Sequence, residues 1–450
     1  MDRAVLRIAA AGGTGLWNPV PLLGNRGRNA VSLNETPRSS RLHIAIFGRR
    51  NAGKSSIINA ITKQEIAVVS AVKGTTTDPV YKSMELLPIG PIVLIDTAGL
   101  DDEGELGELR RKKTLEVLNK TDLALIVVDA AEGVTEFDRE IAELVRGKSI
   151  PAIGVLNKTD LLAEDAEGAE AALAAEERAA SELGLKTVAV SAKEDQRIAE
   201  LKKALIAAVP DEEDKFRIVG DLLSPGDLVV LVVPIDKAAP KGRLILPQQQ
   251  TIRDILESDA IAVVTKEYEL KETLESLGRK PKLVITDSQV FLKVAADTPK
   301  DIPLTSFSIL FARHKGDLEE MVRGARAIDR LQDGDKILIA ESCTHHQQPD
   351  DIGKVKIPRW IRQATGKQLH FDFANGMKFP DNVKDYALIV HCGGCMMNRR
   401  QMLWRVEQAV EAGVPIVNYG VAIAYVQGIL ERAISPFPLA RFAWEEGERI

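Results

Sequence analysis

The stretch Gly48-Arg49-Arg50-Asn51-Ala52-Gly53-Lys54-Ser55 limits the possible folds of this chain more than any other segment. It follows a short apolar run at 43–47 and precedes a helical pattern at 54–61. Glycines at this spacing let backbone N–H groups surround phosphate oxygens, while a lysine reaches the terminal phosphates and a hydroxyl takes a place on Mg²⁺. The segment therefore predicts a nucleotide-phosphate site between a buried strand and the helix that follows it.

Short strands rich in β-branched residues alternate with helical stretches from residue 42 to about residue 209. This alternation predicts an α/β fold with a doubly wound parallel sheet. The chain has 450 residues, which at roughly 150 residues per domain corresponds to about three domains. We expect a disordered extension at 1–40, a nucleotide-binding domain at 41–210, a small α/β domain at 215–303 and a third α/β domain at 304–450.

Charge and cysteine content narrow the class of protein. Lysine and arginine together number 59 against 65 aspartates and glutamates, a net charge of −6 that argues against broad electrostatic binding of nucleic acid. No apolar run approaches the ~20 residues that a membrane helix needs, so no membrane is expected. Three cysteines are too few for a disulfide scaffold, and a reducing cytoplasm is the expected location.

Three further motifs follow predicted strands in the same domain. Asp96-Thr97-Ala98-Gly99 predicts an aspartate that holds Mg²⁺ through water and a Gly99 amide that senses the γ-phosphate. In Asn157-Lys158-Thr159-Asp160, the Asp160 carboxylate suits the two donors on guanine N1 and N2, and adenine lacks that amine. Ser191-Ala192-Lys193 ends the next strand, where a backbone amide can meet guanine O6. The four motifs together predict a guanine-nucleotide site.

A second constellation lies in the last quarter of the chain. Cys343-Thr344-His345 follows one predicted strand, and His391-Cys392-Gly393-Gly394-Cys395 follows another. Because ligands gather at the carboxyl ends of strands in open α/β sheets, these two loops are expected to meet. The residue types fit tetrahedral Zn²⁺ or an iron–sulfur cluster, and Cys-x-x-Cys alone is also typical of a redox dithiol. We predict a metal site whose metal the composition leaves open.

The four nucleotide motifs resemble those of the translation-factor-related GTPases, nearest to the branch of the tRNA-modification and Era-like GTPases. That branch has a Gly-Thr-Thr-x-Asp switch segment, matched here by residues 74–78. The resemblance implies that Thr76 contacts Mg²⁺ and that Asn51 ligates a K⁺ that stimulates hydrolysis. Leu100 stands where Ras-type enzymes have a water-orienting glutamine, so slow intrinsic hydrolysis is expected. The nucleotide-binding and catalytic candidates are Gly48, Asn51, Gly53, Lys54, Ser55, Ser56, Thr76, Asp96, Gly99, Asn157, Lys158, Asp160, Ser191, Ala192 and Lys193.

A GTPase domain, a small middle domain and a Cys-x-His … His-Cys-x-x-Cys domain together resemble the FeFe-hydrogenase maturation GTPases, the HydF family. The resemblance implies that Cys343, Cys392 and Cys395 hold a 4Fe–4S cluster, with His345 or His391 as a labile fourth ligand. It also implies a homodimer formed by the middle domain. The family carries a transient diiron precursor cluster, which it receives from the radical-SAM maturases HydE and HydG and delivers to apo-FeFe-hydrogenase, with GTP hydrolysis regulating partner binding or release.

One rival interpretation is an Era-like or tRNA-modifying GTPase whose C-terminal domain is stabilised by zinc. It predicts a basic RNA-binding face, whereas the third domain has no dense Lys/Arg tract. Iron and sulfide in native protein favour the maturation scaffold. Stoichiometric zinc or co-purifying RNA favours the rival.

Overall fold

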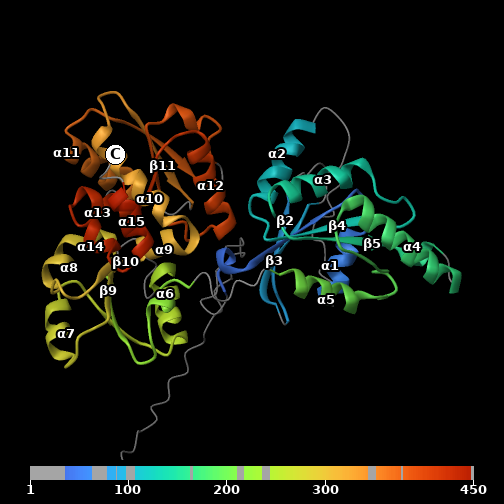
Figure 1. The fold of residues 1–450 in the computed structure, drawn as a ribbon, viewed down its shortest axis with the longest axis horizontal. Helices are drawn as coiled ribbons and strands as arrows, with labels where there is room; N and C mark the ends of the chain where they lie inside the picture. The colour runs from blue at the N-terminus through green and yellow to red at the C-terminus, as the bar shows by residue number, and fades with distance from the viewer. Residues whose placement is uncertain are drawn as a thin grey trace, which may run out of the picture. The chain divides into compact units, whose positions relative to one another are not determined.

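The computed structural model describes residues 36–62, 79–87, 89–97, 107–162, 166–209, 217–235, 244–342, 351–376 and 379–446. All described elements belong to a unit that spans Pro37–Ile450. Figure 1 shows helices and strands alternating along the chain. In the described part of the chain, no helix combines the length and apolar character needed to cross a bilayer.

The nucleotide-binding domain contains a six-stranded sheet in the order β2-β3-β1-β4-β5-β6. The strands are β1 Leu42–Phe47, β2 Val80–Leu86, β3 Gly90–Asp96, β4 Leu123–Asp129, β5 Ala152–Asn157 and β6 Thr187–Ala189. The helices are α1 Lys54–Thr62, α2 Gly107–Leu118, α3 Glu136–Gly147, α4 Ala166–Leu183 and α5 Ile198–Ala208. Four pairings in the sheet are parallel, and only β2 joins it antiparallel, along β3.

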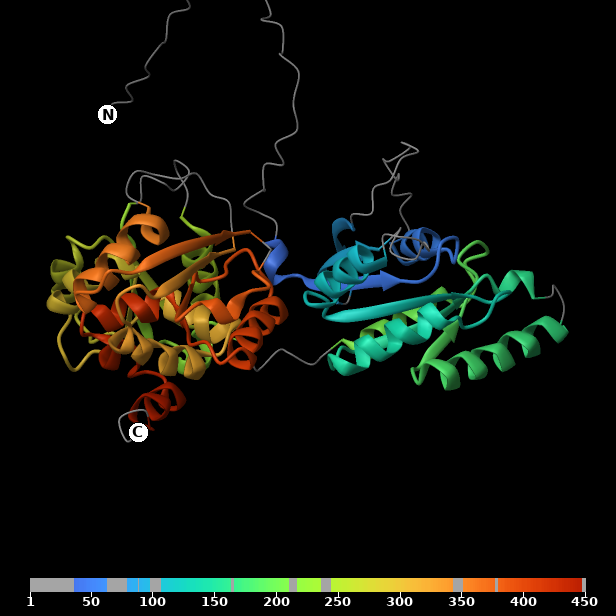
Figure 2. The same cartoon turned by 90° about the horizontal axis from the view of Figure 1, so that it is seen from above.

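The helices cover both faces of this sheet. Apolar residues of α1 and α5 pack in one buried cluster, and those of α2, α3 and α4 pack in a second. Figure 1 shows α1 and α5 on the opposite side of the strands from α2 and α3, and Figure 2 shows the same cartoon from above. The doubly wound parallel sheet predicted from the alternation of strands and helices is confirmed.

The middle part of the chain forms a four-stranded parallel sheet in the order β10-β9-β7-β8. Its strands are β7 Leu228–Val232, β8 Ile261–Thr265, β9 Leu283–Thr286 and β10 Leu304–Ser306. Its helices are α6 Leu246–Glu257, α7 Leu270–Ser276, α8 Phe291–Asp297 and α9 Phe307–Lys315. The predicted boundary between residues 303 and 304 therefore falls inside this sheet, because β10 pairs with β9.

The C-terminal part forms a second four-stranded parallel sheet in the order β12-β11-β13-β14. Its strands are β11 Lys336–Glu341, β12 His370–Asn375, β13 Leu388–His391 and β14 Ile416–Asn418. Its helices are α10 Leu318–Ala325, α11 Ile357–Thr365, α12 Arg399–Glu411, α13 Tyr419–Val426, α14 Leu430–Ile434 and α15 Pro438–Glu446. A π-helical turn at Ile352–Lys356 leads into α11.

One hydrophobic cluster runs through the middle and C-terminal sheets. It includes β7 and β9 of the first sheet, β11 and β13 of the second, and residues of α9 that lie between them in sequence. The two sheets therefore share a single core, whereas the nucleotide-binding domain has two clusters of its own.

Candidate functional site

The phosphate loop joins β1 to α1, as the motif predicts. Gly48 and Gly53 have φ of +142° and +91°, backbone conformations that residues with a Cβ rarely adopt. A Cβ on Gly48 would lie 2.2 Å from the Val127 carbonyl oxygen, so only glycine allows this close approach to β4. The two glycines therefore fix the shape of the loop against the sheet.

Asn157 connects three of the nucleotide motifs. Its Nδ2 donates to the Ala52 carbonyl at 2.9 Å, and its Oδ1 accepts from the Ala192 amide at 3.1 Å. The side chain is 2% exposed. The last residue of β5 thus holds the phosphate loop on one side and the segment predicted to meet guanine O6 on the other.

Asp160 is held in place by its neighbour in the fourth motif. Ser191 donates its hydroxyl to Asp160 Oδ1 at 2.7 Å, and the Lys193 ammonium lies 3.9 Å from Oδ2. Ser191 is fully buried, whereas Lys193 is exposed. The carboxylate is thereby oriented by a buried hydroxyl, as recognition of two adjacent donors requires.

Two of the predicted magnesium residues, Ser55 and Asp96, lie together at the end of β3. The Ser55 hydroxyl is 3.4 Å from Asp96 Oδ2, and Asp96 is 6% exposed. Lys54 is buried and donates to the Arg49 carbonyl at 2.8 Å. These oxygen donors fit Mg²⁺, which binds few carboxylates and completes its shell with phosphate and water.

Of the remaining candidates for this site, two are described by the structure and two lie outside the described residues. Asn51, with φ of +65°, is exposed on the phosphate loop, and Ser56 is exposed on α1. Thr76 and Gly99, with the rest of the switch segment and Leu100, lie outside the described residues.

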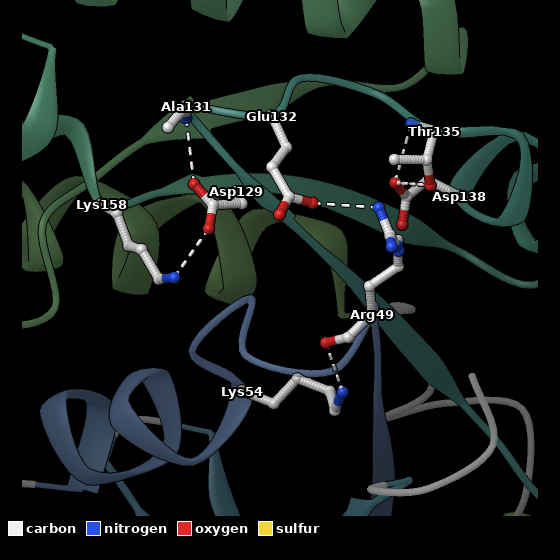
Figure 3. A network of polar contacts seen from close by, with 8 residues as sticks. All are labelled: Arg49, Lys54, Asp129, Ala131, Glu132, Thr135, Asp138 and Lys158. Carbon is white, nitrogen blue, oxygen red and sulfur yellow. Dashed lines mark hydrogen bonds and ion pairs between the residues drawn. The ribbon is translucent and has the colours of Figure 1, made fainter. Parts of the chain in front are cut away.

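A polar network beside the phosphate loop was not predicted from the sequence (Figure 3). Lys158 forms an ion pair with Asp129 at 2.6 Å, and Arg49 forms one with Glu132 at 3.0 Å. Asp129 could have been found, because it ends β4 at the same edge of the sheet as the motifs. Through Arg49 and Glu132 the network joins the phosphate loop to the loop after β4. Through Lys158 and Asp129 it joins the end of β4 to the residue that follows β5.

Asp138 belongs to this network and is 2% exposed. Its Oδ2 accepts from the Thr135 amide at 3.0 Å and the Thr135 hydroxyl at 2.7 Å, while its Oδ1 has no hydrogen-bond partner in the described structure. Burial raises the pKa of Asp138, and the Thr135 hydrogen bonds and the charges of Arg49 and Lys54 oppose that rise. The Thr-x-x-Asp spacing is a capping-box signature that the sequence analysis passed over.

The neighbouring strands β11 and β13 end side by side, and Ser342, which follows β11, contacts Cys392, which follows β13. The Cys392 Sγ lies 3.2 Å from the Ser342 amide nitrogen and 3.3 Å from its hydroxyl, and Cys343 is the next residue in the chain. Burial raises the pKa of the Cys392 thiol, and hydrogen bonds from Ser342 oppose that rise. Cys343 and His345 themselves lie outside the described residues, and within the described ones no three metal-binding side chains gather.

His391 is placed differently from the ligand that the sequence predicted. Its ring is fully buried, its Nδ1 lies 2.7 Å from the Cys392 carbonyl and its Nε2 lies 2.9 Å from Arg405 Nη1. Because a carbonyl needs a donor and a guanidinium needs an acceptor, the proton sits on Nδ1. Burial lowers the pKa of His391 to about 3, with the Arg405 charge adding to the effect. Both ring nitrogens are thus engaged in this structure, and neither is directed to the thiols.

The buried pair of Tyr419 and Glu341 beside Cys392 was also not predicted from the sequence. The Tyr419 hydroxyl donates to Glu341 Oε1 at 3.1 Å, and both side chains are buried. The pKa of Tyr419 is raised well above its usual range, first by burial and then by the nearby Cys392 and Glu341. Gly353 lies against the pair, since a Cβ there would come within 2.3 Å of the Tyr419 oxygen.

Three family models match the chain. Residues 43–158 match the 50S ribosome-binding GTPase model, residues 218–316 the hydrogen maturase F dimerization domain, and residues 319–436 the hydrogen maturase F tetramerization domain. The boundary between the last two falls after α9, in agreement with the pairing of β10 in the middle sheet. The match of residues 319–436 to a tetramerization domain was not predicted from the sequence.

Two curated relatives are GTPases that each match about a third of this chain. The tRNA modification GTPase MnmE of Desulfotalea psychrophila is 35% identical over 169 residues, 37% of this chain and 34% of that protein. GTPase Der of Heliobacterium modesticaldum is 34% identical over 167 residues, 34% of this chain and 38% of that protein. The chain thus spans about a third of the length of these relatives.

Among solved structures, Aquifex aeolicus Era bound to GDP·AlF4⁻ covers 52% of this chain and 98% of its own, at 20% identity and a TM-score of 0.33. The two hydrogen maturase F models match residues 218–316 and 319–436, which follow the segment that the GTPase model matches. With the GTPase model ahead of them in the order that the motifs predict, this chain belongs to the hydrogen maturase F (HydF) family of GTPases.

Proposed function

We propose that this protein is a GTP-hydrolysing scaffold for hydrogenase maturation that carries a 4Fe–4S cluster and transfers a diiron precursor to apo-FeFe-hydrogenase. The observation that supports the proposal is the contact between Ser342 and Cys392 Sγ at 3.2 Å, because Ser342 is the residue directly before Cys343. A guanine-nucleotide site and a cysteine site in one chain fit a scaffold in which GTP hydrolysis regulates the binding or release of partner proteins.

Each part of the nucleotide site has a defined role in the proposal. Asp160, oriented by Ser191, selects guanine, and Asn157 holds the phosphate loop in register with the base site. Ser55 and Asp96 would hold Mg²⁺, which supplies the charge that phosphoryl transfer needs. Asn51 would hold K⁺, and hydrolysis without an additional activator is expected to be slow.

Cys343, Cys392 and Cys395 would hold the cluster, which supplies an iron centre with an exchangeable coordination site. Two features of the described residues fit such a group. Lys315 and Arg405 are buried cations beside the Cys392–Cys395 loop that form no ion pair with a described carboxylate, and Arg405 Nε has no hydrogen-bond partner. A buried positive charge without a carboxylate calls for an anionic group nearby, as thiolate-bound iron and sulfide provide.

The placement of His391 favours His345, or a ligand from outside the chain, as the fourth ligand. His391 would have to break its contact with Arg405 to reach iron, leaving a buried guanidinium without that acceptor. His391 therefore acts in the proposal as a positioning residue that holds the Cys392 backbone. HydE, HydG and apo-FeFe-hydrogenase are the proposed partners, and a homodimer in the cytoplasm is the proposed state.

The experiment is anaerobic purification of wild type and of C343A, C392A and C395A, each assayed for iron, sulfide and activation of apo-hydrogenase. We expect about four irons per wild-type chain, with each variant losing iron and activation while GTP turnover is retained. H391A should retain iron, since His391 is not proposed as a ligand. Stoichiometric zinc in native wild type, or RNA that co-purifies, would contradict the proposal and favour an RNA-associated GTPase.

The potassium role is tested separately. GTP turnover in K⁺ and in Na⁺ is compared for wild type and N51A, with N59A on α1 as a matched amide-removing control. Turnover is expected to be faster in K⁺ for wild type and N59A, and equal in the two salts for N51A. Equal rates in wild type would remove the proposed role of Asn51.

A further inference from the structure

Lys315, the last residue of α9, is buried to 2% exposure, which is rare for a lysine. Its ammonium donates to the Met397 carbonyl at 2.8 Å, the Cys395 carbonyl at 3.3 Å and the Gly394 carbonyl at 3.4 Å. An ammonium group has three N–H donors, and all three are directed at one short segment of backbone. Lys315 therefore closes the loop that presents Cys392 and Cys395.

Arg405, on α12, approaches the same loop from its other end. It is 0% exposed, donates to His391 Nε2 at 2.9 Å and to the Gly376 carbonyl at 2.9 Å, and lies over the ring of Phe379. Through His391, whose Nδ1–H donates to the Cys392 carbonyl, the guanidinium supports the first cysteine of the loop. Lys315 and Arg405 thus hold the two ends of the segment from Cys392 to Met397.

Neither cation forms an ion pair with a carboxylate of the described residues, and the acceptors they contact are all neutral. Burying two positive charges among neutral acceptors is unfavourable, because carbonyl oxygens replace only part of the lost hydration. An iron–sulfur cluster held by thiolates carries net negative charge, and its reduction adds one more electron. Both cations would therefore stabilise the cluster, and the reduced cluster more than the oxidised one.

We propose that Lys315 and Arg405 are positioning residues that hold the Cys392–Cys395 loop and balance the negative charge of the cluster bound there, thereby raising its reduction potential. This inference rests on the proposed function, since it concerns the same site. It adds two residues, from α9 and α12, that no cysteine or histidine motif contains.

The test uses the full chain, reconstituted anaerobically with iron and sulfide, as wild type, K315M, K315R and R405K. K293M on α8 is the matched control, because Lys293 is paired with Asp297 at 2.9 Å and is not among the residues that contact the loop. The cluster's midpoint potential is measured by a redox titration followed by electron paramagnetic resonance. For K315M we expect reduction to be about tenfold less favourable, ~59 mV more negative for one electron. K293M, K315R and R405K, which keep both buried charges, should remain close to wild type.

A second measurement needs no cluster. In apo-protein, Cys395 should react with iodoacetamide several-fold faster in K315M and K315R than in wild type, since neither substitute can bind three carbonyls in the manner of an ammonium. Peptide mass spectrometry identifies the cysteine that has reacted, and circular dichroism reports whether each variant is folded. If K315M is unfolded, K315R decides the role in holding the loop.

The outcomes separate the inference from the proposed function. A wild-type chain that binds no iron contradicts the proposed function, and the alkylation rates then still decide whether Lys315 holds the loop. A wild-type chain that binds a cluster, with K315M unchanged in potential and in alkylation rate, overturns the inference and leaves the proposed function standing.

Discussion

At the scale of single residues, Asp160 of the proposed guanine site has a carboxylate whose orientation is fixed by a hydrogen bond. The Ser191 hydroxyl occupies one side of the carboxylate at 2.7 Å, so the remaining acceptor positions point in a fixed direction. A base whose donors match them binds, and one that lacks the donors leaves a carboxylate unpaired.

Asp160→Asn is therefore expected to lower the affinity for GTP by roughly 10²-fold, about 3 kcal/mol. The asparagine amide donates where guanine also donates, so xanthosine triphosphate, with a carbonyl in place of the amine, should bind the variant better than GTP does. Titration with fluorescent nucleotide analogues measures both affinities. Unchanged GTP affinity would show that this carboxylate does not contact the base.

Asp138 offers a second residue-scale prediction, through its pKa. A carboxyl whose pKa is raised on folding takes up a proton in the folded state first, so it contributes stability at low pH that is lost as pH rises through the folded pKa. The unfolding free energy of wild type relative to Asp138→Asn should therefore increase as pH falls from 7 toward 4. The readout is the thermal transition that GDP shifts. Glu143→Gln, at an exposed position of α3, should show no such trend because water screens its charge.

At the scale of elements, α10 packs on β14 through a glycine. A Cβ on Gly324 would lie 2.0 Å from the Ile416 carbonyl oxygen, and that oxygen is backbone, which cannot rotate away. Helix and strand therefore approach each other more closely than any side chain allows.

Gly324→Ala is expected to destabilise the C-terminal body by about 1–3 kcal/mol, because the helix must move away from the strand. A lower thermal midpoint in the transition that GDP does not shift would show this. Gly147→Ala, at the last residue of α3, provides the control: its Cβ would meet nothing within 4 Å, so stability should be unchanged or slightly higher. Equal effects of the two substitutions would contradict the packing argument.

Sequence patterns predicted central elements better than edge ones. Buried strands such as β4 have continuous apolar runs, whereas β12 at His370–Asn375 is largely exposed and β10 at Leu304–Ser306 is only three residues long. These two strands and the antiparallel β2 at Val80–Leu86 were not predicted. The pairing of an edge strand depends on the strand beside it more than on its own residues.

The candidate sites divide in the same way. The rule that ligands gather at strand ends predicted that the cysteine motifs follow neighbouring strands, and β11 and β13 are indeed paired. The meeting of the two loops stays a prediction, because Cys343 and His345 lie outside the described residues. The use of His391 could not be predicted, because its partner Arg405 is a buried cation on a helix that the motif does not contain. Lys315 has the same character: a lysine at the end of a helix is ordinarily solvated, and only packing buries this one.

At the scale of the whole molecule, oligomerisation is supported by the two family models over residues 218–436. In the described residues β8 pairs only with β7, and its Ile261 and Val264 are 44% and 48% exposed. An open strand edge with exposed apolar side chains is a template for pairing with another chain. We propose that a second copy of this chain covers the β8 edge.

Val264→Glu is accordingly expected to weaken self-association at least tenfold, because association would bury an unpaired carboxylate. Sedimentation velocity over a range of protein concentrations measures the change. Leu173→Glu on α4 introduces the same charge at a site that is 53% exposed in the nucleotide-binding domain, and it should leave the oligomeric state unaltered. An assembly that tolerates Val264→Glu would place the contact elsewhere.

Cutting the chain between residues 316 and 319 would separate two family models, yet it would also divide one continuous apolar interior that extends from Ile218 to Ala440. Each fragment would leave large side chains without their packing partners, among them Phe307 and Phe311 of α9. Neither half is therefore a sound unit for recombinant expression. The β8 edge and the Cys392–Cys395 loop therefore belong to one packed body, and a change that loosens its shared core affects both.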